Sequence, residues 1–384
     1  EAMIAHQDST GRAGVMTPPL LHRETAHMIY GISRYAKLSG DRPWLRKNWH
    51  VVEAAMQYLI DLREITLQDS EAPYYGLFPP GYTDGGVSGV NPEYGSTYWG
   101  LIAMAEAVRA ARWIGDAQAE TRWRREFDAF LSSFRRAATR DMRRDEDGNP
   151  YLPVLMNFDP ETNVPQRGQW GVIQSYYAGQ FLDDADSLLL GTLAMLERNT
   201  VESHVVSLGW LTGGIWPIFE AHRALVYNRL GNADMTVDLL YAFANHASPT
   251  FVWVEEQMPK GEGTRTTGDS PHTIGNVQII RLVRNMLVLE REGVLELFPS
   301  LPSSWLTSGS VIALKAAPTE FGQLDARLVV GSDEAELSID SRGATVKIRT
   351  RAFTDAGFKT ANGQSLADFV HHTGAGRTVI RFSR

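Results

Sequence analysis

The sequence predicts a mainly α-helical domain followed by a small antiparallel β-sandwich. Three observations lead to this fold class. Apolar residues recur every three or four positions as far as residue 305, the connections between these periodic segments alternate between short and long, and beyond Trp305 apolar residues alternate with polar ones instead. We therefore expect a helical domain over 1–305 and a β-sandwich domain over 306–384.

Nine helices are predicted for the first domain. In the clearest case Leu45, Trp49 and Val52 begin an apolar stripe that continues to Leu59, and such steps of four and three keep one side of a helix apolar. The nine segments are about 22–39, 45–59, 98–108, 123–134, 169–182, 185–198, 213–230, 233–247 and 271–291.

The connections between the helices indicate how they are arranged. Short joints at 39–41, 115–116, 183–184 and 231–232 carry Gly, Asn or Asp, which end helices. The other connections are long: 68–94, 141–168, 199–212 and 248–270. Strict alternation predicts a ring of antiparallel helical hairpins whose long loops emerge on one face. These loops hold Trp, Tyr, Pro and Gly, which favours a functional role for them.

The final segment predicts strands over 310–314, 326–330, 335–339, 344–351 and 378–382. They are short, rich in β-branched residues and separated by Gly, Asp and Asn turn signals. The alternation in Thr345–Arg349 predicts a sheet with one solvated face, which an antiparallel sheet permits.

A closed ring of six hairpins would need twelve helices, and the sequence supplies nine. If the last predicted helix is the twelfth, residues upstream of this sequence, on the same chain or a separate one, complete the ring. The first residue is Glu instead of Met, which also suggests a processed or truncated chain.

Composition excludes several classes of partner and chemistry. With 37 Lys and Arg against 45 Asp and Glu, the net charge is −8, so we expect neither nucleic acid nor an anionic membrane as partner. The absence of Cys excludes disulfides, thiolate metal sites and Cys nucleophiles, and leaves the cellular compartment undecided. Neither the Glu24–His27 pair nor His371–His372 has further ligands nearby, so no metal or organic cofactor is expected.

Two stretches before the last predicted helix carry a family resemblance. Trp253–Gln257 (WVEEQ), followed by Gly268–His272 (GDSPH), resembles the late loop of the six-hairpin (α/α)6-toroid glycoside hydrolases, the glucoamylase-like superfamily. In that family an Ala-Glu-Gln stretch carries the general base. The resemblance therefore implies an (α/α)6 toroid, glycosidic bond hydrolysis with inversion, and Glu256 or Glu255 as the general base.

The same architecture implies a general acid in the loop 68–94, where we choose Asp84. Hydrolysis needs one protonated and one ionised carboxyl group. Apolar and aromatic neighbours such as Leu77, Phe78 and Tyr82 are suited to keep a carboxyl group protonated. Glu93 is the rival, although a carboxylate in the first turn of a helix is also favoured by the helix dipole.

Aromatic residues gather in the long loops and at the helix ends beside them. Their flat faces suit the apolar face of a pyranose ring, although each of them also suits a protein core. Gln169 and His272 follow long loops and have side chains that can bond sugar hydroxyls. The aromatic candidates are Tyr82, Tyr94, Trp99, Trp170, Trp210, Trp216 and Trp253.

The leading hypothesis is a glycoside hydrolase that acts on an oligosaccharide or polysaccharide. The first alternative is a polysaccharide lyase on a similar toroid, in which Tyr82, Tyr94, His204 and His272 would supply the Tyr and His of proton abstraction. The second is a carbohydrate-binding protein without catalysis. A serine hydrolase is not expected, because no Gly-x-Ser-x-Gly sequence occurs.

Overall fold

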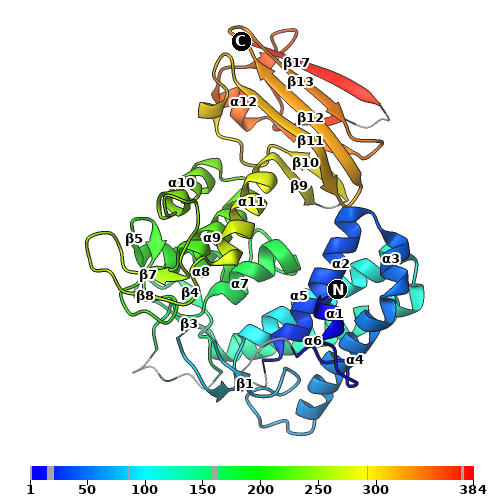
Figure 1. Ribbon diagram of the computed structural model, residues 1–384, viewed down its shortest axis with the longest axis vertical. Helices are drawn as coiled ribbons and strands as arrows, with labels where there is room; N and C mark the ends of the chain where they lie inside the picture. The colour runs from blue at the N-terminus through cyan, green and yellow to red at the C-terminus, as the bar shows by residue number, and fades with distance from the viewer. Residues whose placement is uncertain are drawn as a thin grey trace. The chain divides into compact units, whose positions relative to one another are not determined.

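The computed structural model describes residues 2–14, 21–84, 86–156, 159, 163–291, 293–372 and 376–384 (Figure 1). The chain forms two compact units. The first comprises 1–36, 41–222 and 246–275, and the second comprises 37–40, 223–245 and 276–384.

Each predicted helix has a counterpart in the described part of the chain. The predicted helix over 45–59 is two helices separated at Asn48, and the predicted helix over 169–182 changes from α to π geometry at Ser175. The bounds are α1 (Ala2–Ala5), α2 (Arg23–Ser39), α3 (Arg42–Lys47), α4 (Trp49–Thr66), α5 (Gly95–Ile114), α6 (Ala117–Asp141), α7 (Trp170–Gln174), the π-helix η1 (Ser175–Gly179), α8 (Ser187–Arg198), α9 (Pro217–Leu230), α10 (Ala233–Asn245) and α11 (Thr273–Leu287).

The hairpin of α5 and α6 shows why the short joints end helices. Gly115 adopts φ 85°, a left-handed conformation that suits glycine, and ends α5. Asp116 then caps α6, because its side chain accepts a hydrogen bond from the backbone N–H of Ala119 at 2.9 Å. The second oxygen of Asp116 accepts from the indole N–H of Trp49 at 3.0 Å. The joint therefore turns the chain and also ties this hairpin to α4.

The two helices of this hairpin differ in burial. Helix α5 is buried on most of its faces, whereas α6 buries a single stripe that includes Trp123, Phe127 and Phe130. A helix that is apolar all round belongs in an interior, and a helix with one apolar stripe covers it. Helix α6 therefore covers the more buried helix α5.

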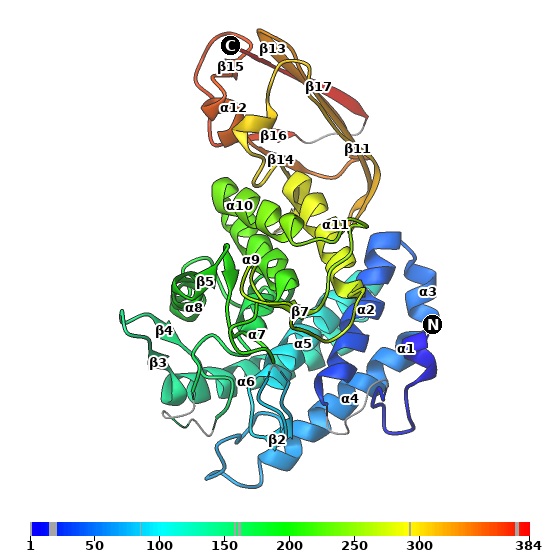
Figure 2. The same ribbon diagram turned by 60° about the vertical axis from the view of Figure 1, so that its left-hand side comes forward.

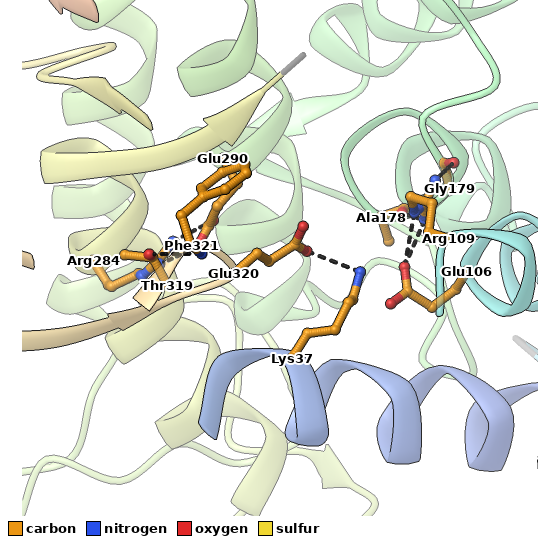
Figure 3. A network of polar contacts seen from close by, with 10 residues as sticks. All are labelled: Lys37, Glu106, Arg109, Ala178, Gly179, Arg284, Glu290, Thr319, Glu320 and Phe321. Atoms are coloured by element: carbon orange, nitrogen blue, oxygen red, sulfur yellow. Dashed lines mark hydrogen bonds and ion pairs between the residues drawn. The ribbon is translucent and has the colours of Figure 1, made fainter. Parts of the chain in front are cut away.

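An ion pair on α5 holds the end of the π-helix η1 (Figure 3). Glu106 is buried and lies 2.8 Å from Arg109. The guanidinium of Arg109 donates to the carbonyl oxygens of Gly179 at 3.2 Å and Ala178 at 3.4 Å. These carbonyls lie at the C-terminal end of η1, where a helix lacks internal donors.

The four long connections lie together in the first unit. The backbone N–H of Tyr94 donates to Val154 at 2.9 Å, and that of Gly168 donates to Leu208 at 3.0 Å. These bonds join three of the connections, and the N–H of Trp210, which donates to the side chain of Glu256 at 2.8 Å, joins the fourth. Each connection also contains a short antiparallel pair: β1 (Gly81–Tyr82) with β2 (Val90–Asn91), β3 (Arg143–Arg144) with β4 (Pro150–Tyr151), β5 (Thr200–Val201) with β6 (His204–Val205), and β7 (Glu256–Gln257) with β8 (Thr266–Thr267).

The second unit contains two sheets (Figure 1). A five-stranded antiparallel sheet has the order β11-β12-β13-β17-β15, and a four-stranded sheet has the order β16-β14-β10-β9. The strands are β9 (Val288–Arg291), β10 (Val294–Leu297), β11 (Val311–Thr319), β12 (Gly322–Val330), β13 (Glu334–Asp340), β14 (Val346–Arg349), β15 (Lys359–Thr360), β16 (Phe369–His372) and β17 (Arg377–Ser383).

The two sheets share one hydrophobic core. Leu328 and Leu337 of the five-stranded sheet belong to the same buried cluster as Leu295 and Ile348 of the other sheet. Phe353, from the short helix α12 (Arg351–Asp355), is also fully buried in this core. Figure 2 shows β14 and β16 on one side of the five-stranded sheet.

The sequence prediction differs from this unit in two respects. Strands begin at Val288, where a continuation of the last helix to 291 was expected, and β10 pairs with β14 in parallel, so the second sheet is not purely antiparallel. The hydrophobic pattern of the sequence was ambiguous here, because a short apolar run such as Val294–Leu297 fits either a helix or a strand. The domain boundary between residues 305 and 306 stays a prediction.

Ion pairs also connect elements within the second unit (Figure 3). Arg284 on α11 donates to Glu290 on β9 at 2.8 Å and to the carbonyl oxygen of Pro318 on β11 at 2.9 Å. Lys37 lies 3.0 Å from Glu320, in the turn after β11.

Among the described residues, no helix is both long and apolar enough to cross a lipid bilayer.

Candidate active site

The Glu256 side chain is buried and held by backbone donors. Glu256 lies on β7 and is 2% exposed. Its two carboxylate oxygens accept hydrogen bonds from the backbone N–H groups of Trp210 at 2.8 Å and Leu211 at 2.7 Å. Burial raises the pKa of Glu256, the two N–H groups oppose that shift, and the charges of Glu255 and Asp84 add to it. Asp84 is therefore close enough to act electrostatically on Glu256.

Glu255 precedes β7 and has different surroundings from Glu256. Glu255 is half-buried and accepts a hydrogen bond from the backbone N–H of Asp269 at 3.3 Å. Burial lowers the pKa of His272, and the charges of Glu255 and Asp269 oppose this effect. Glu255 thus lies beside His272, whereas Glu256 is held by the loop that contains Trp210.

Arg23 links two of the predicted carboxylates. The guanidinium of Arg23, on α2, forms an ion pair with Asp84, whose side chain is 35% exposed. The same guanidinium lowers the pKa of Glu93 against the larger effect of burial. It also adds to the burial that lowers the pKa of His27 to about 3, so His27 is neutral. Arg23 is therefore near Asp84, Glu93 and His27.

Glu93 caps helix α5. Its two carboxylate oxygens accept from the backbone N–H of Ser96 at 2.9 and 3.1 Å, and the side chain is 7% exposed. Burial raises the pKa of Glu93, while the bonds from Ser96 lower it. These bonds satisfy a donor at the start of the helix, which is the structural role that the sequence left open for this carboxylate.

Four of the predicted sugar-binding aromatics keep accessible surface. Trp210 is 42% exposed, and Tyr82, Trp99 and Trp216 are half-buried. The indole N–H of Trp99 donates to the side-chain oxygen of Gln174 at 2.8 Å. These four side chains are therefore the aromatic candidates that a sugar can reach.

Three other aromatic candidates lie in the interior. Tyr94 is 1% exposed, and its hydroxyl donates to Asp141 at 2.6 Å. Trp170 is 7% exposed and packs edge-on against Trp216 with ring centroids 5.1 Å apart, and Trp253 is 4% exposed. Their burial favours a role in the core, and sugar binding by these three side chains stays a prediction.

The two polar candidates also differ. The side-chain amide of Gln169 donates to the carbonyl oxygens of Leu152 and Pro165, each at 2.9 Å, so it connects parts of the backbone. His272 is 6% exposed, and its Nδ1 is buried with no hydrogen-bond partner among the described residues. His272 is therefore buried with one ring nitrogen unbonded among the described residues, whereas the donors of Gln169 are used within the protein.

The substitution of buried and exposed Trp residues tests this division. We expect Trp170→Ala and Trp253→Ala to destabilise the fold by about 3–5 kcal/mol, because each removes a buried aromatic side chain. Trp210→Ala should leave the melting temperature nearly unchanged and weaken oligosaccharide binding. Thermal unfolding and titration calorimetry of the three variants check this, and normal stability of Trp170→Ala and Trp253→Ala would contradict it.

Sequence reasoning did not find Arg23 or the backbone donors of Trp210 and Leu211. The ion-pair partner of Arg23 is Asp84, which lies far along the chain, and backbone N–H groups cannot be recognised from residue types.

The described residues include no cluster of three or more His, Asp or Glu side chains that could hold a metal ion.

Comparisons with known proteins identify the fold. No protein-family profile and no curated protein matches the chain. The structure of an α-L-rhamnosidase from Dictyoglumus thermophilum matches 100% of this chain and 43% of that chain, with 10% identity and a TM-score of 0.57. A GH78 family rhamnosidase of Bacillus sp. GL1 matches 83% of this chain and 30% of that chain, with 11% identity and a TM-score of 0.50. This chain shares their fold. It spans less than half the length of either.

Proposed function

We propose that the chain carries the active site of a glycoside hydrolase, with Asp84 as general acid and Glu256 as general base. The observation that carries the proposal is the buried carboxylate of Glu256, which two backbone N–H groups hold and on which the charge of Asp84 acts. A buried carboxyl group with a perturbed pKa, beside a second carboxylate from another loop, is typical of functional sites. The fold shared with two rhamnosidases supports the same reaction class.

In the proposed reaction Asp84 gives its proton to the glycosidic oxygen as the bond to the anomeric carbon breaks. Glu256 accepts a proton from the water that attacks this carbon from the opposite side. The products are a free alcohol and a sugar with inverted anomeric configuration. The two N–H bonds suit Glu256 to this role, because they orient the ionised carboxylate and leave lone pairs for the water.

The Asp84 role requires one further step. The guanidinium of Arg23 is paired with the Asp84 carboxyl group, so this contact must open before Asp84 can give a proton to the glycosidic oxygen. We propose that the bound sugar brings about this separation. Glu93 is the competing acid, and it would have to leave the backbone N–H of Ser96.

The architecture and substrate are part of the same proposal. We infer that the hairpins form part of an (α/α)6 toroid, that the two sheets form a sandwich, and that upstream residues complete the ring. The substrate is an oligosaccharide or polysaccharide, and no cofactor takes part. Because the two similar structures are described as rhamnosidases, aryl α-L-rhamnosides are the first substrates to test.

The lyase alternative has less support. A lyase needs an accessible tyrosine or histidine near the substrate. Among its four candidates, Tyr94 is bonded to Asp141 in the interior, His204 is 0% exposed and His272 is 6% exposed. Tyr82 is half-buried and stays open to this role. The ultraviolet absorbance of an unsaturated uronic acid would identify a lyase, and sugar binding without turnover would identify a non-catalytic binding protein.

The pH dependence of activity tests the role of Glu256. A general base must be ionised, so kcat/KM falls as the pH decreases through its pKa. Because burial raises the pKa of Glu256 above its ordinary value of 4.5, we expect the midpoint of the acid limb to lie above pH 4.5. A midpoint below pH 4.5 would contradict this assignment.

A further inference from the structure

The loop Ser207–Gly214, here called the cradle loop, is closed by its own hydrogen bonds. The backbone N–H of Ser207 donates to Gly214 at 2.9 Å, and the N–H of Gly213 donates to the Ser207 hydroxyl at 2.9 Å. Within the loop, the N–H of Gly214 donates to Leu211 at 2.8 Å. These internal hydrogen bonds therefore hold the cradle loop in the conformation in which the N–H groups of Trp210 and Leu211 donate to Glu256.

Gly209 leaves the space that the Glu256 carboxylate occupies. A Cβ atom added to Gly209 would overlap Oε1 of Glu256. Gly209 is not among the residues with positive φ, so its backbone is open to alanine. Glycine is therefore required at position 209 because a side chain there would occupy the space of the Glu256 carboxylate.

The loop that carries Asp84 rests on the same glycine. Gly86, two residues after Asp84, adopts φ 79°, and a Cβ atom added to it would overlap the carbonyl oxygen of Gly209. The absence of a Cβ atom at Gly86 therefore allows the backbones of the two loops to approach each other closely. Through this contact, the segment that follows Asp84 lies directly against the segment that holds Glu256.

We propose that Gly209 is a positioning residue for the general base, and that its contact with Gly86 sets the separation between Asp84 and Glu256. A side chain at position 209 displaces the Glu256 carboxylate from the N–H groups of Trp210 and Leu211. The inference rests on the proposed function, because it gives Glu256 a role in catalysis. It adds that the backbone contact between Gly86 and Gly209 determines the distance between the Asp84 and Glu256 carboxylates.

The first test replaces Gly209 by Ala. A displacement of about 1 Å at a reacting group can lower turnover roughly 10²-fold, so we expect Gly209→Ala to lower kcat by about that factor with little change in KM. Gly14→Ala is the matched control, because a Cβ atom at Gly14 meets nothing within 4 Å and its backbone also lacks positive φ. A kcat of Gly209→Ala equal to that of Gly14→Ala would overturn the inference.

The second test is rescue by a shorter carboxylate. Glu256→Asp withdraws the carboxylate by one methylene group from the space that the alanine fills. The double variant Gly209→Ala/Glu256→Asp should therefore be more active than the product of the two single effects predicts. If Gly209 only supported the fold, the two losses would simply multiply.

The third test does not depend on activity. In protein with carbon-13 in the glutamate carboxyl groups, the Glu256 signal is the one that disappears in Glu256→Gln. We expect its pKa to be higher in Gly209→Ala than in the wild type, because the carboxylate loses two N–H donors. An unchanged pKa would overturn the placement of the carboxylate by Gly209. Full activity of Glu256→Gln would overturn the catalytic role of Glu256, and with it the proposed function, but not that placement.

Discussion

Glu256→Gln is expected to lower turnover by roughly 10²-fold or more, with sugar binding largely retained. Glutamine keeps the shape of the side chain and can still accept one of the two backbone N–H bonds, but it cannot take a proton from water. Steady-state kinetics with an aryl glycoside and calorimetric binding of the product sugar measure the two quantities. The melting temperature should change little.

Glu255→Gln is the matched control for this substitution. Both glutamates lie in the same stretch of chain, but Glu255 accepts from the N–H of Asp269 and lies beside His272. We expect Glu255→Gln to change KM more than kcat, because Glu255 then affects sugar binding and not proton transfer. Full turnover by Glu256→Gln together with loss in Glu255→Gln would transfer the role of general base to Glu255.

Asp84→Asn is expected to cause a loss of similar size, also roughly 10²-fold or more, because asparagine cannot give a proton to the leaving oxygen. A substrate with a good leaving group, such as a nitrophenyl glycoside, should suffer much less than a natural disaccharide. This dependence on the leaving group is the signature of a lost general acid. It separates a chemical role of Asp84 from its structural ion pair with Arg23.

Glu93→Gln distinguishes the two candidate acids. If Glu93 is only the cap of α5, this variant should keep kcat and lose about 0.5–2 kcal/mol of stability, the usual effect of a weakened helix cap. Activity that survives in Asp84→Asn and vanishes in Glu93→Gln would move the acid to Glu93. If both variants stay active, the carboxylate pair is wrong.

The helices were predictable from the sequence, whereas one strand pair was not. Helical periodicity over many residues, as in the stripe that begins at Leu45, is a strong signal, and Gly115 and Asp116 mark a helix end by their own chemistry. The run Val294–Leu297 is too short to carry a period, and its partner β14 lies far along the chain. Long-range pairing of this kind leaves no local signal.

The candidate site was predictable only in part, for a related physical reason. Asp84 and Glu256 were proposed because hydrolysis needs a protonated and an ionised carboxyl group and because a motif resemblance pointed to their loops, and their roles stay predictions. The contribution of Gly209 is the absence of a side chain, and that of Arg23 is an ion pair with another element. These contributions of Gly209 and Arg23 arise only when the fold brings separate segments together, so the sequence alone does not reveal them. The burial of Trp170 and Trp253 was not predicted, because a loop position does not determine burial.

A crystal structure with a bound sugar tests the catalytic pairing of Asp84 and Glu256 most directly, through the separation of their carboxyl groups across the anomeric carbon. For an inverting hydrolase we expect roughly 6.5–9.5 Å, which leaves room for the attacking water beside Glu256. A separation of about 5–5.5 Å would indicate retention through a covalent intermediate. A sugar bound away from both carboxylates would contradict the proposed active site.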